Sequence, residues 1–242
     1  MGSRRRPIDP ANLGGLSADI FGKLHRLSIQ LPVLPLLSLE DLDALPDVAF
    51  HRFHHPLSDI FIELNGAPRA SRHHADELRM IAYLQARKPD LQDFSTFETY
   101  LCETLSAAIG KDVRFRSHDV GLGAGRDGVP VLFPRASQVR LLLRTSHKFI
   151  FSLADPVLRA TCALVFILNC HPFADGNGRL ARVYFNYLLI EAGYRHYFPL
   201  STIIDRSRGG FELAVRMLEL KSDWYPIIVY IGNALGLRAV DW

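Results

Sequence analysis

The sequence predicts a mainly α-helical domain that contains one β-hairpin. From about Ala75 onward, apolar residues recur at helical spacing, whereas the alternation that is typical of strands occurs in one short region only. A third observation is the segment TCALVFILNC, residues 161–170, which is apolar on every side and therefore predicts a buried central helix.

The first half of the chain carries fewer clear signals. Residues 1–10 are predicted to be a loose terminus. Residues 11–50 alternate proline, leucine and acidic residues without a clean period, which indicates an irregular and partly packed segment. Two helices are then predicted, one at residues 75–89 and one at residues 93–110, where a proline and a glycine act as stops.

The only convincing β signal lies between residues 113 and 134. A short alternating run, a glycine-rich turn with Asp127-Gly128 and a second apolar run together indicate a hairpin. The turn contains the pattern Gly-x-Gly-x-x-Gly, but a β run and not a helix follows it, so we do not interpret it as a dinucleotide-binding loop. Further helices are predicted at residues 137–151, 156–170, 178–192, 209–220 and 224–235.

Composition limits the classes of function. The 242 residues carry a net charge of +3 and 48% hydrophobic residues, which suits a large core but not the concentrated basic faces of nucleic-acid-binding proteins. No apolar run reaches the roughly 18 residues that a membrane span needs, and no signal-peptide core follows the basic start. We therefore expect a cytoplasmic protein with neither nucleic acid nor membrane as a partner, while delivery into another cell stays open.

The cysteines and the histidine clusters do not predict a metal site. Cys102, Cys162 and Cys170 lack Cys-x-x-Cys spacing and lie in apolar stretches, so we expect buried reduced thiols. The histidines in HRFHHP and RHHADE have neither cysteine partners nor a regular helical spacing, and solvated or packing roles are expected for them.

The segment HPFADGNGRLAR, residues 171–182, predicts the functional site. Pro172 disfavours the helical conformation at His171, so the preceding helix should end there and present the imidazole at the mouth of a loop. Gly176 and Gly178 let the backbone turn tightly, and the next helix begins with free N–H groups that point back at the same place. The loop is therefore a candidate anion site.

Two arginines occupy the first turn of that next helix, where positive charge is mildly unfavourable. Arg179 and Arg182 lie on one face, and a multiply charged phosphate would turn this penalty into charge-assisted contacts. Asp175 would repel the phosphate unless Mg²⁺ bridged the two. Taken singly, the histidine could cap a helix and Asp175 could form an Asx turn, but their combination favours a histidine base, a magnesium carboxylate and a phosphate cradle.

The segment also resembles the signature of the Fic domain family, His-x-Phe-x-Asp/Glu-Gly-Asn-Gly-Arg-x-x-Arg, at every defined position. The predicted order of a hairpin, two helices and then the motif is similar to that family as well. The resemblance implies a Fic-type helical bundle with a β-hairpin flap at residues 91–242. It says nothing about residues 1–90, which we treat as an N-terminal extension.

The resemblance implies transfer of AMP from ATP to a hydroxyl side chain of a target protein, with Mg²⁺ and release of pyrophosphate. His171 would be the general base, Phe173 would anchor the loop and Asp175 would hold Mg²⁺. Arg179 would contact the β-phosphate and Arg182 the γ-phosphate. The full set of nucleotide-binding residues implied in this way is Gly176, Asn177, Gly178, Arg179 and Arg182.

The hairpin, residues 119–134, would by the same resemblance be the flap that clamps the target. It would add the target's modified segment as an edge strand, a main-chain mode of recognition that needs little sequence specificity. The flap residues expected to take part are Asp119, Val129, Val131 and Phe133. The sequence does not indicate whether Ser, Thr or Tyr is modified, or on which protein.

Other functions stay open at this point. A relative called Doc transfers the γ-phosphate as a kinase does, but has lysine in place of the second motif glycine, so Gly178 favours AMP transfer. Some members with a similar motif use UDP or choline-bearing nucleotides, so UMP transfer is an alternative. A nonenzymatic module that binds a nucleotide or a partner protein is another.

Fic proteins are commonly inhibited by a glutamate in the motif Ser/Thr-x-x-x-Glu-Gly/Asn, which pairs with the second motif arginine. None of the eight glutamates of this chain is followed by glycine or asparagine, and the nearest candidate, Glu63, lies five positions after Ser58. We therefore expect Arg182 to be free in the isolated chain and an inhibitory carboxylate to come from a separate antitoxin protein. The alternative is that another residue of the N-terminal part, or a contact within an oligomer, blocks the site.

Overall fold

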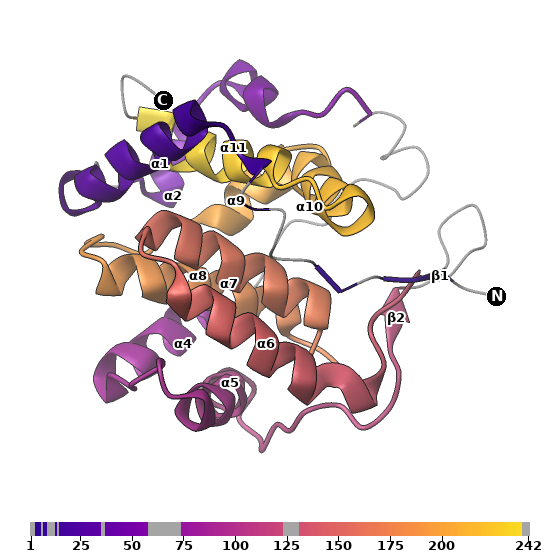
Figure 1. Ribbon diagram of the computed structural model, residues 1–242. Coiled ribbons are helices and arrows are strands. Elements are labelled where there is room, and N and C mark those ends of the chain that lie inside the picture. The colour runs from indigo at the N-terminus through magenta and orange to yellow at the C-terminus, as the bar shows by residue number, and fades with distance from the viewer. Residues whose placement is uncertain are drawn as a thin grey trace.

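The fold consists of packed helices with a small sheet at one end (Figure 1), which confirms the predicted fold class. The computed structural model describes residues 3–5, 7–8, 13, 15–34, 37–57, 74–122 and 131–238. In chain order the strands and α-helices are β1 Ser3–Arg4, α1 Ala18–Gln30, α2 Leu39–Ala44, α4 His74–Arg87, α5 Phe94–Ile109, β2 Gly121–Leu122, β3 Val131–Leu132, α6 Val139–Ser152, α7 Pro156–Cys170, α8 Asn177–Glu191, α9 Leu200–Arg206, α10 Gly210–Lys221 and α11 Tyr225–Leu235. Short 3-10 helices lie at Leu31–Val33, Asp47–Phe53, Ala136–Gln138 and Gly236–Arg238.

Helices α7 and α8 form the centre of the fold. The side chain of Asp155 caps α7 by accepting a hydrogen bond from the Leu158 N–H at 2.8 Å, and Pro156 begins the helix. Nearly all side chains of α7 are buried, which confirms the predicted central helix. Because α6 packs on α7 while α4 packs on both α8 and α5, the loop between α7 and α8 is fixed by helices on several sides.

Residues 18–30, which the sequence predicts to be irregular, instead form helix α1. The Ser17 hydroxyl accepts a hydrogen bond from the Ile20 N–H at 3.4 Å, and Ile20, Leu24 and Leu27 bury one face of the helix. Helix α1 packs on α7 and α11, and its buried side chains belong to the same core as those of the later helices. The helical spacing of these apolar residues was not recognised in the sequence, because prolines and further leucines flank the segment.

The predicted hairpin is present, because β2 pairs antiparallel with β3 in the register Gly121↔Leu132 and Leu122↔Val131. Its turn, with Asp127 and Val129, lies outside the described residues. Strand β1 was not expected: it pairs parallel with β3, which gives the sheet order β1–β3–β2. The sheet therefore joins residues 3–4, which were predicted to be a loose terminus, to the flap (Figure 1).

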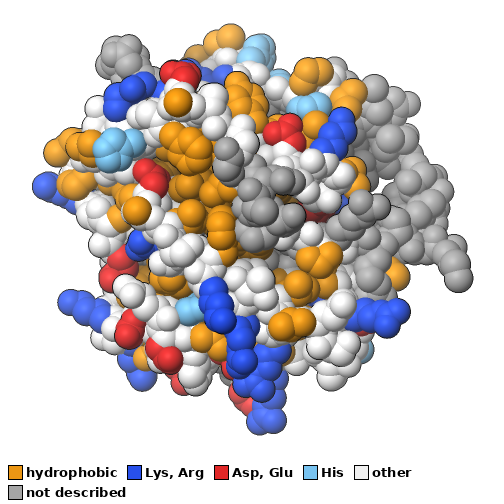
Figure 2. Space-filling model, in the orientation of Figure 1, with side chains coloured by type: hydrophobic (Ala, Val, Ile, Leu, Met, Phe, Trp, Pro, Cys, Tyr) orange, Lys and Arg blue, Asp and Glu red, His pale blue; other side chains and the backbone are white. Residues whose placement is uncertain are grey.

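On the face drawn in Figure 2, Lys and Arg side chains lie mostly around the edge, with hydrophobic side chains nearer the middle. Among the described residues, no helix has the length and apolar character required to cross a membrane. The three cysteines are free thiols; Cys162 and Cys170 are buried as expected, whereas Cys102 is only partly buried. Burial raises the pKa of Cys102 to about 11 and that of Cys170 to about 12.

Candidate functional site

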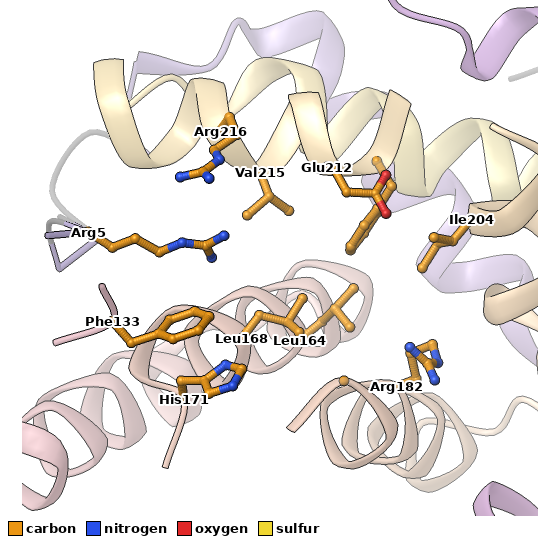
Figure 3. A pocket seen from close by; sticks show the side chains of 12 residues that line it. Arg5, Phe133, Leu164, Leu168, His171, Arg182, Ile204, Glu212, Val215 and Arg216 are labelled. Carbon is orange, nitrogen blue, oxygen red and sulfur yellow. The ribbon is translucent and has the colours of Figure 1, made fainter. Parts of the chain in front are cut away.

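A cavity of about 320 Å³ lies where the loop between α7 and α8 meets α10 and the end of β3 (Figure 3). It brings together four residues of the predicted site, namely His171, Gly178 and Arg182 of the motif and Phe133 of the flap. Its other wall is largely apolar. The complete lining is Arg5, Phe133, Leu164, Leu168, His171, Gly178, Arg182, Ile204, Phe211, Glu212, Val215 and Arg216.

His171 ends helix α7, as Pro172 predicts, and adopts a left-handed backbone conformation with φ of +49°. Such a conformation is uncommon for a residue other than glycine and occurs often at functional sites. The ring of Phe133 stacks on the imidazole, with 3.6 Å between centroids and 11° between planes. The Nδ1 atom of His171 is buried and has no hydrogen-bond partner.

Burial is the main cause that lowers the pKa of His171 to about 4, and the positive charges of Arg5 and Arg116 contribute to this shift. The imidazole is therefore neutral at neutral pH, which is the state that a general base requires.

Arg116 holds His171 and the flap together, a role that the sequence did not indicate. Its buried guanidinium donates to the His171 carbonyl at 2.7 Å, to the His118 carbonyl at 3.2 Å and to the Pro134 carbonyl at 2.5 Å. Its own N–H donates to the Pro172 carbonyl at 2.9 Å. Only an arginine has enough donors in a fixed fork to connect these carbonyls at once.

Two residues determine the conformation of the loop after His171, and few other amino acids could replace either of them. Gly176 has φ of +85°, and a Cβ atom there would lie 2.6 Å from a methyl carbon of Leu105, so glycine is required. The Asn177 side chain accepts from the Phe173 N–H and donates to the Phe173 carbonyl, both at 2.9 Å. Phe173 itself is buried, as expected for the anchor of the loop. The side chain of Asn177 thus braces the loop, and its contact with a phosphate stays a prediction.

Arg182 is not free, contrary to the sequence-based expectation. Its Nε and Nη2 atoms donate to one carboxylate oxygen of Glu77, at 2.9 and 2.5 Å, and Glu77 is completely buried on α4. The hydroxyl of Tyr197 donates to the other carboxylate oxygen of Glu77. A carboxylate of the chain itself therefore occupies the place that we assigned to a phosphate, and the reason to expect a separate inhibitory protein no longer holds.

Arg179 is engaged in the same way by the neighbouring residue of α4. Its Nη1 atom lies 2.8 Å from a carboxylate oxygen of Asp76, and its Nη2 atom lies 3.2 Å from one of Asp175. Both motif arginines thus have carboxylate partners supplied by two consecutive residues. These contacts neutralise the positive charge that is otherwise unfavourable in the first turn of α8.

Asp175 lies outside the cavity that His171 and Arg182 share. Its side chain is 87% exposed and lines a neighbouring hollow together with Asp76, Phe173 and Arg179. Within the described ranges, no group of three or more His, Cys, Asp or Glu side chains could hold a metal ion. A cation at Asp175 would need further ligands from a bound phosphate, which is the usual way that a single carboxylate holds Mg²⁺.

The predicted flap residues have different surroundings. Asp119 accepts a hydrogen bond from the Ala136 N–H at 2.8 Å and so fixes the base of the hairpin. Val131 lies on β3 between β1 and β2, and Phe133 covers His171. Val129 lies outside the described residues.

Sequence reasoning missed Asp76 and Glu77 because acidic residues in the first turn of a helix have an ordinary explanation. Such residues stabilise the positive end of the helix dipole, so their pattern does not indicate a distant arginine. Arg5 was missed for a related reason, because it follows a two-residue strand that leaves no period in the sequence.

We expect the pKa of His171 to rise from about 4 toward 6.5 when Phe133 is replaced by alanine, because the imidazole then becomes hydrated. An NMR titration of the imidazole measures this directly. In the native chain the folded-state pKa lies below the unfolded value, so the unfolded chain binds the proton more readily and stability falls as the pH drops from 6.5 to 4. An unchanged titration in Phe133→Ala would contradict the role of the stacked ring.

Comparison with known proteins gives one consistent family. A family model described as "Fic/DOC family" matches residues 88–189. The protein adenylyltransferase fic-1 of Caenorhabditis elegans is 30% identical over 79 residues, which are 33% of this chain and 15% of that protein. A Fido domain-containing protein of Dictyostelium discoideum is 31% identical over 81 residues, 34% of this chain and 57% of that protein. These matches thus span less than two thirds of either relative.

Solved structures share the fold over most of the chain. A Fic family protein from Desulfovibrio desulfuricans G20 has a TM-score of 0.58 at 18% identity, with 98% of this chain and 75% of that chain covered. Fic-1 from C. elegans has a TM-score of 0.54 at 17% identity, with coverages of 94% and 72%. IbpAFic2, in a crystal structure in which it is covalently tethered to Cdc42, has a TM-score of 0.54 at 17% identity, with coverages of 91% and 70%.

Proposed function

We propose that this chain, whose residues 88–189 match the Fic/DOC family model, transfers AMP from ATP to a hydroxyl side chain of a target protein. The observation that carries this proposal is the single cavity that His171, Gly178 at the start of α8 and Arg182 line together; Figure 3 shows His171 and Arg182 in it. A base and an anion site in one cavity suit attack by a hydroxyl on a phosphate.

In this reaction the hydroxyl oxygen of the target attacks the α-phosphorus of ATP. The bond between the α-phosphorus and the bridging oxygen breaks, and pyrophosphate leaves with the electron pair of that bond. His171 accepts the hydroxyl proton on its imidazole, which lines the cavity. The free N–H groups at the start of α8, near Gly178, stabilise the negative charge that develops on the phosphate.

The outer phosphates of ATP would bind Arg179 and Arg182, so Asp76 and Glu77 must first leave these arginines. The geometry thus fits a chain that keeps its own phosphate site occupied until ATP displaces the two carboxylates. An internal carboxylate also makes a separate antitoxin unnecessary for holding Arg182.

Mg²⁺ would be held by Asp175, whose exposed carboxylate suits a cation that keeps several waters and phosphate oxygens as ligands. When bound, the ion would neutralise part of the phosphate charge. Arg179, the present partner of Asp175, would turn to the β-phosphate.

The geometry at Gly178 favours AMP transfer over phosphate transfer. A Cβ atom at this position would lie 3.3 Å from the Nη1 atom of Arg182. A lysine there, as in the phosphate-transferring relative, would press on that arginine and add a second positive charge. Gly178 leaves Arg182 in reach of an outer phosphate.

The apolar end of the cavity is suited to bind a nucleotide base that carries an amino group. Ile204, Phe211 and Val215 provide apolar surfaces for the ring, and Glu212 points toward the cavity from α10 (Figure 3). The Oε2 atom of Glu212 is buried without a hydrogen-bond partner. A carboxylate oxygen accepts hydrogen bonds, so it suits the 6-amino group of adenine.

We expect the triphosphate of purine riboside, which lacks the 6-amino group, to bind about tenfold or more weakly than ATP, because it leaves this carboxylate oxygen unpaired. Calorimetry with Glu77→Gln, in which Arg182 is released, measures the difference. Replacement of Glu212 by alanine should make the affinities for ATP and for the triphosphate of purine riboside nearly equal. Equal affinities in the chain that retains Glu212 would contradict its role.

The experiment that tests the proposed function uses two samples of ATP, one labelled on the α-phosphate and one on the γ-phosphate. Each is incubated with Mg²⁺, the protein and a lysate. Label that reaches protein from the α position alone supports AMP transfer. Label from the γ position alone would replace it with kinase activity, and no label from either would favour a nonenzymatic module.

A further inference from the structure

In this structure, strand β1 of the same chain pairs with the edge of β3 that faces away from β2. Strand β1 pairs parallel with β3 in the register Ser3↔Val131 and Arg4↔Leu132. The Arg5 N–H extends this pairing by donating to the Leu132 carbonyl at 2.6 Å. Because the other edge of β3 is paired with β2, β1 lies on the one edge of β3 that could accept a further strand.

This edge of β3 lies next to His171, the proposed general base. The residue after β3 is Phe133, whose ring stacks on His171. Figure 3 shows the side chain of Arg5 on the opposite face of that ring, so that Arg5, Phe133 and His171 form three layers. An extended segment in the place of β1 would therefore run beside the group that must meet the target hydroxyl.

Arg5 occupies a built cation site. Its guanidinium carbon lies 4.6 Å from the centroid of the Phe133 ring, and its Nη1 atom lies 2.9 Å from Oε1 of Glu219. The side chain of Glu219 is almost completely buried on α10, and the Asn169 amide donates to the same oxygen at 3.0 Å. A planar guanidinium can stack on the ring and pair with the carboxylate together, which an ammonium group does less well.

The site can lose Arg5 without leaving a buried charge unpaired. Arg216 approaches the other oxygen of Glu219 at 3.4 Å and so remains as a partner for the carboxylate. The segment also stays attached beyond the strand, because Ile8 is buried and its N–H donates to the Asn169 side chain at 3.3 Å. Exchange of residues 3–5 for another segment is thus compatible with the surrounding contacts.

We propose that the edge of β3 and the cation site of Phe133 and Glu219 bind an arginine-bearing extended segment of the target protein, and that residues 3–5 hold this place in its absence. The inference rests on the proposed function, since it identifies the chemistry of the target. The main-chain contacts select an extended conformation, and the cation site selects arginine at one position of the segment.

The test uses fluorescent peptides and the full chain without nucleotide. The probe is MGSRRRPI, the first eight residues of this chain, and its matched control has alanine at the position of Arg5. The receptor is Arg5→Pro, which lacks both the N–H group and the guanidinium that hold the edge. Arg140→Ala is the control receptor, because Arg140 is exposed and paired with Glu98 on the surface.

We expect the probe to bind Arg5→Pro at least about tenfold more tightly than it binds the native chain or Arg140→Ala, by fluorescence anisotropy. The alanine peptide should bind Arg5→Pro about tenfold more weakly than the probe. If Arg5→Pro bound the probe and the alanine peptide equally well, the proposed cation site would be wrong. If the probe bound Arg5→Pro and the native chain equally well, residues 3–5 would not be occupying the binding edge.

Thermal unfolding of each receptor shows that it is folded. If Arg5→Pro is not, Arg5→Ala takes its place, and the same two comparisons decide the outcome. Because no nucleotide is present, a failure of peptide binding leaves AMP transfer intact. A chain that binds the probe but transfers no label refutes the proposed activity alone.

Discussion

Replacing Glu77 with glutamine is expected to raise the affinity for ATP by about tenfold or more and to raise AMP transfer with it. The carboxylate of Glu77 holds Arg182 through two hydrogen bonds, so under the proposed function it would compete with the γ-phosphate for the same donors. An uncharged amide competes less well. Calorimetry measures the affinity, and label transferred from the α-phosphate of ATP measures the activity.

The same substitution should lower stability in the absence of nucleotide. Removing one charge of a buried pair lowers the free energy of unfolding by about 3 kcal/mol, because the remaining charge loses its partner. ATP should then raise the melting temperature of Glu77→Gln more than that of the native chain. Glu40→Gln is the matched control, since Glu40 is exposed on α2. Lower stability without a gain in affinity would show that Glu77 serves the fold alone.

Replacing His171 with alanine is expected to lower AMP transfer by about 10² to 10⁴ while ATP affinity stays unchanged. In the proposed reaction the imidazole would accept the proton of the target hydroxyl, whereas the outer phosphates would bind at the start of α8. Transfer and binding are best compared in the Glu77→Gln chain, where the phosphate site is open.

His25→Ala is the matched control for this loss, because His25 lies exposed on α1. Its transfer rate should equal that of the parent chain. If His171→Ala also lost its affinity for ATP, the histidine would be a part of the nucleotide site and another group would have to serve as the base.

The local geometry of the site was predictable because short-range chemistry determines it. Pro172 ends α7 at the residue before His171, and Gly176 provides the left-handed turn at the start of α8. The central helix was predictable for the same kind of reason, since an apolar run capped by Asp155 and Pro156 specifies its own beginning.

The contacts that control the site were not predictable in this way. Glu77 and Arg182 are 105 positions apart, and only the packing of α4 on α8 brings them together. The expectation that Arg182 is free relied on a local motif around a glutamate, whereas the pairing depends on tertiary position. Likewise, the parallel pairing of Ser3 and Arg4 with β3 leaves no trace in a two-residue pattern. The local sequence determines the propensity of a segment to form a helix, strand or turn, whereas pairs that are distant in the sequence form only when the whole chain has folded.

Under the proposed function, the pairing of Glu77 with Arg182 also ties the docking of α4 to the occupancy of the proposed nucleotide site. ATP that takes Arg182 would remove an ion pair between α4 and α8, and a change that weakens this ion pair should in turn raise the affinity for ATP. Ligands usually slow amide hydrogen exchange throughout the protein that binds them. Here the amides of α4 would exchange faster when ATP is bound, while those of the loop after His171 would exchange more slowly.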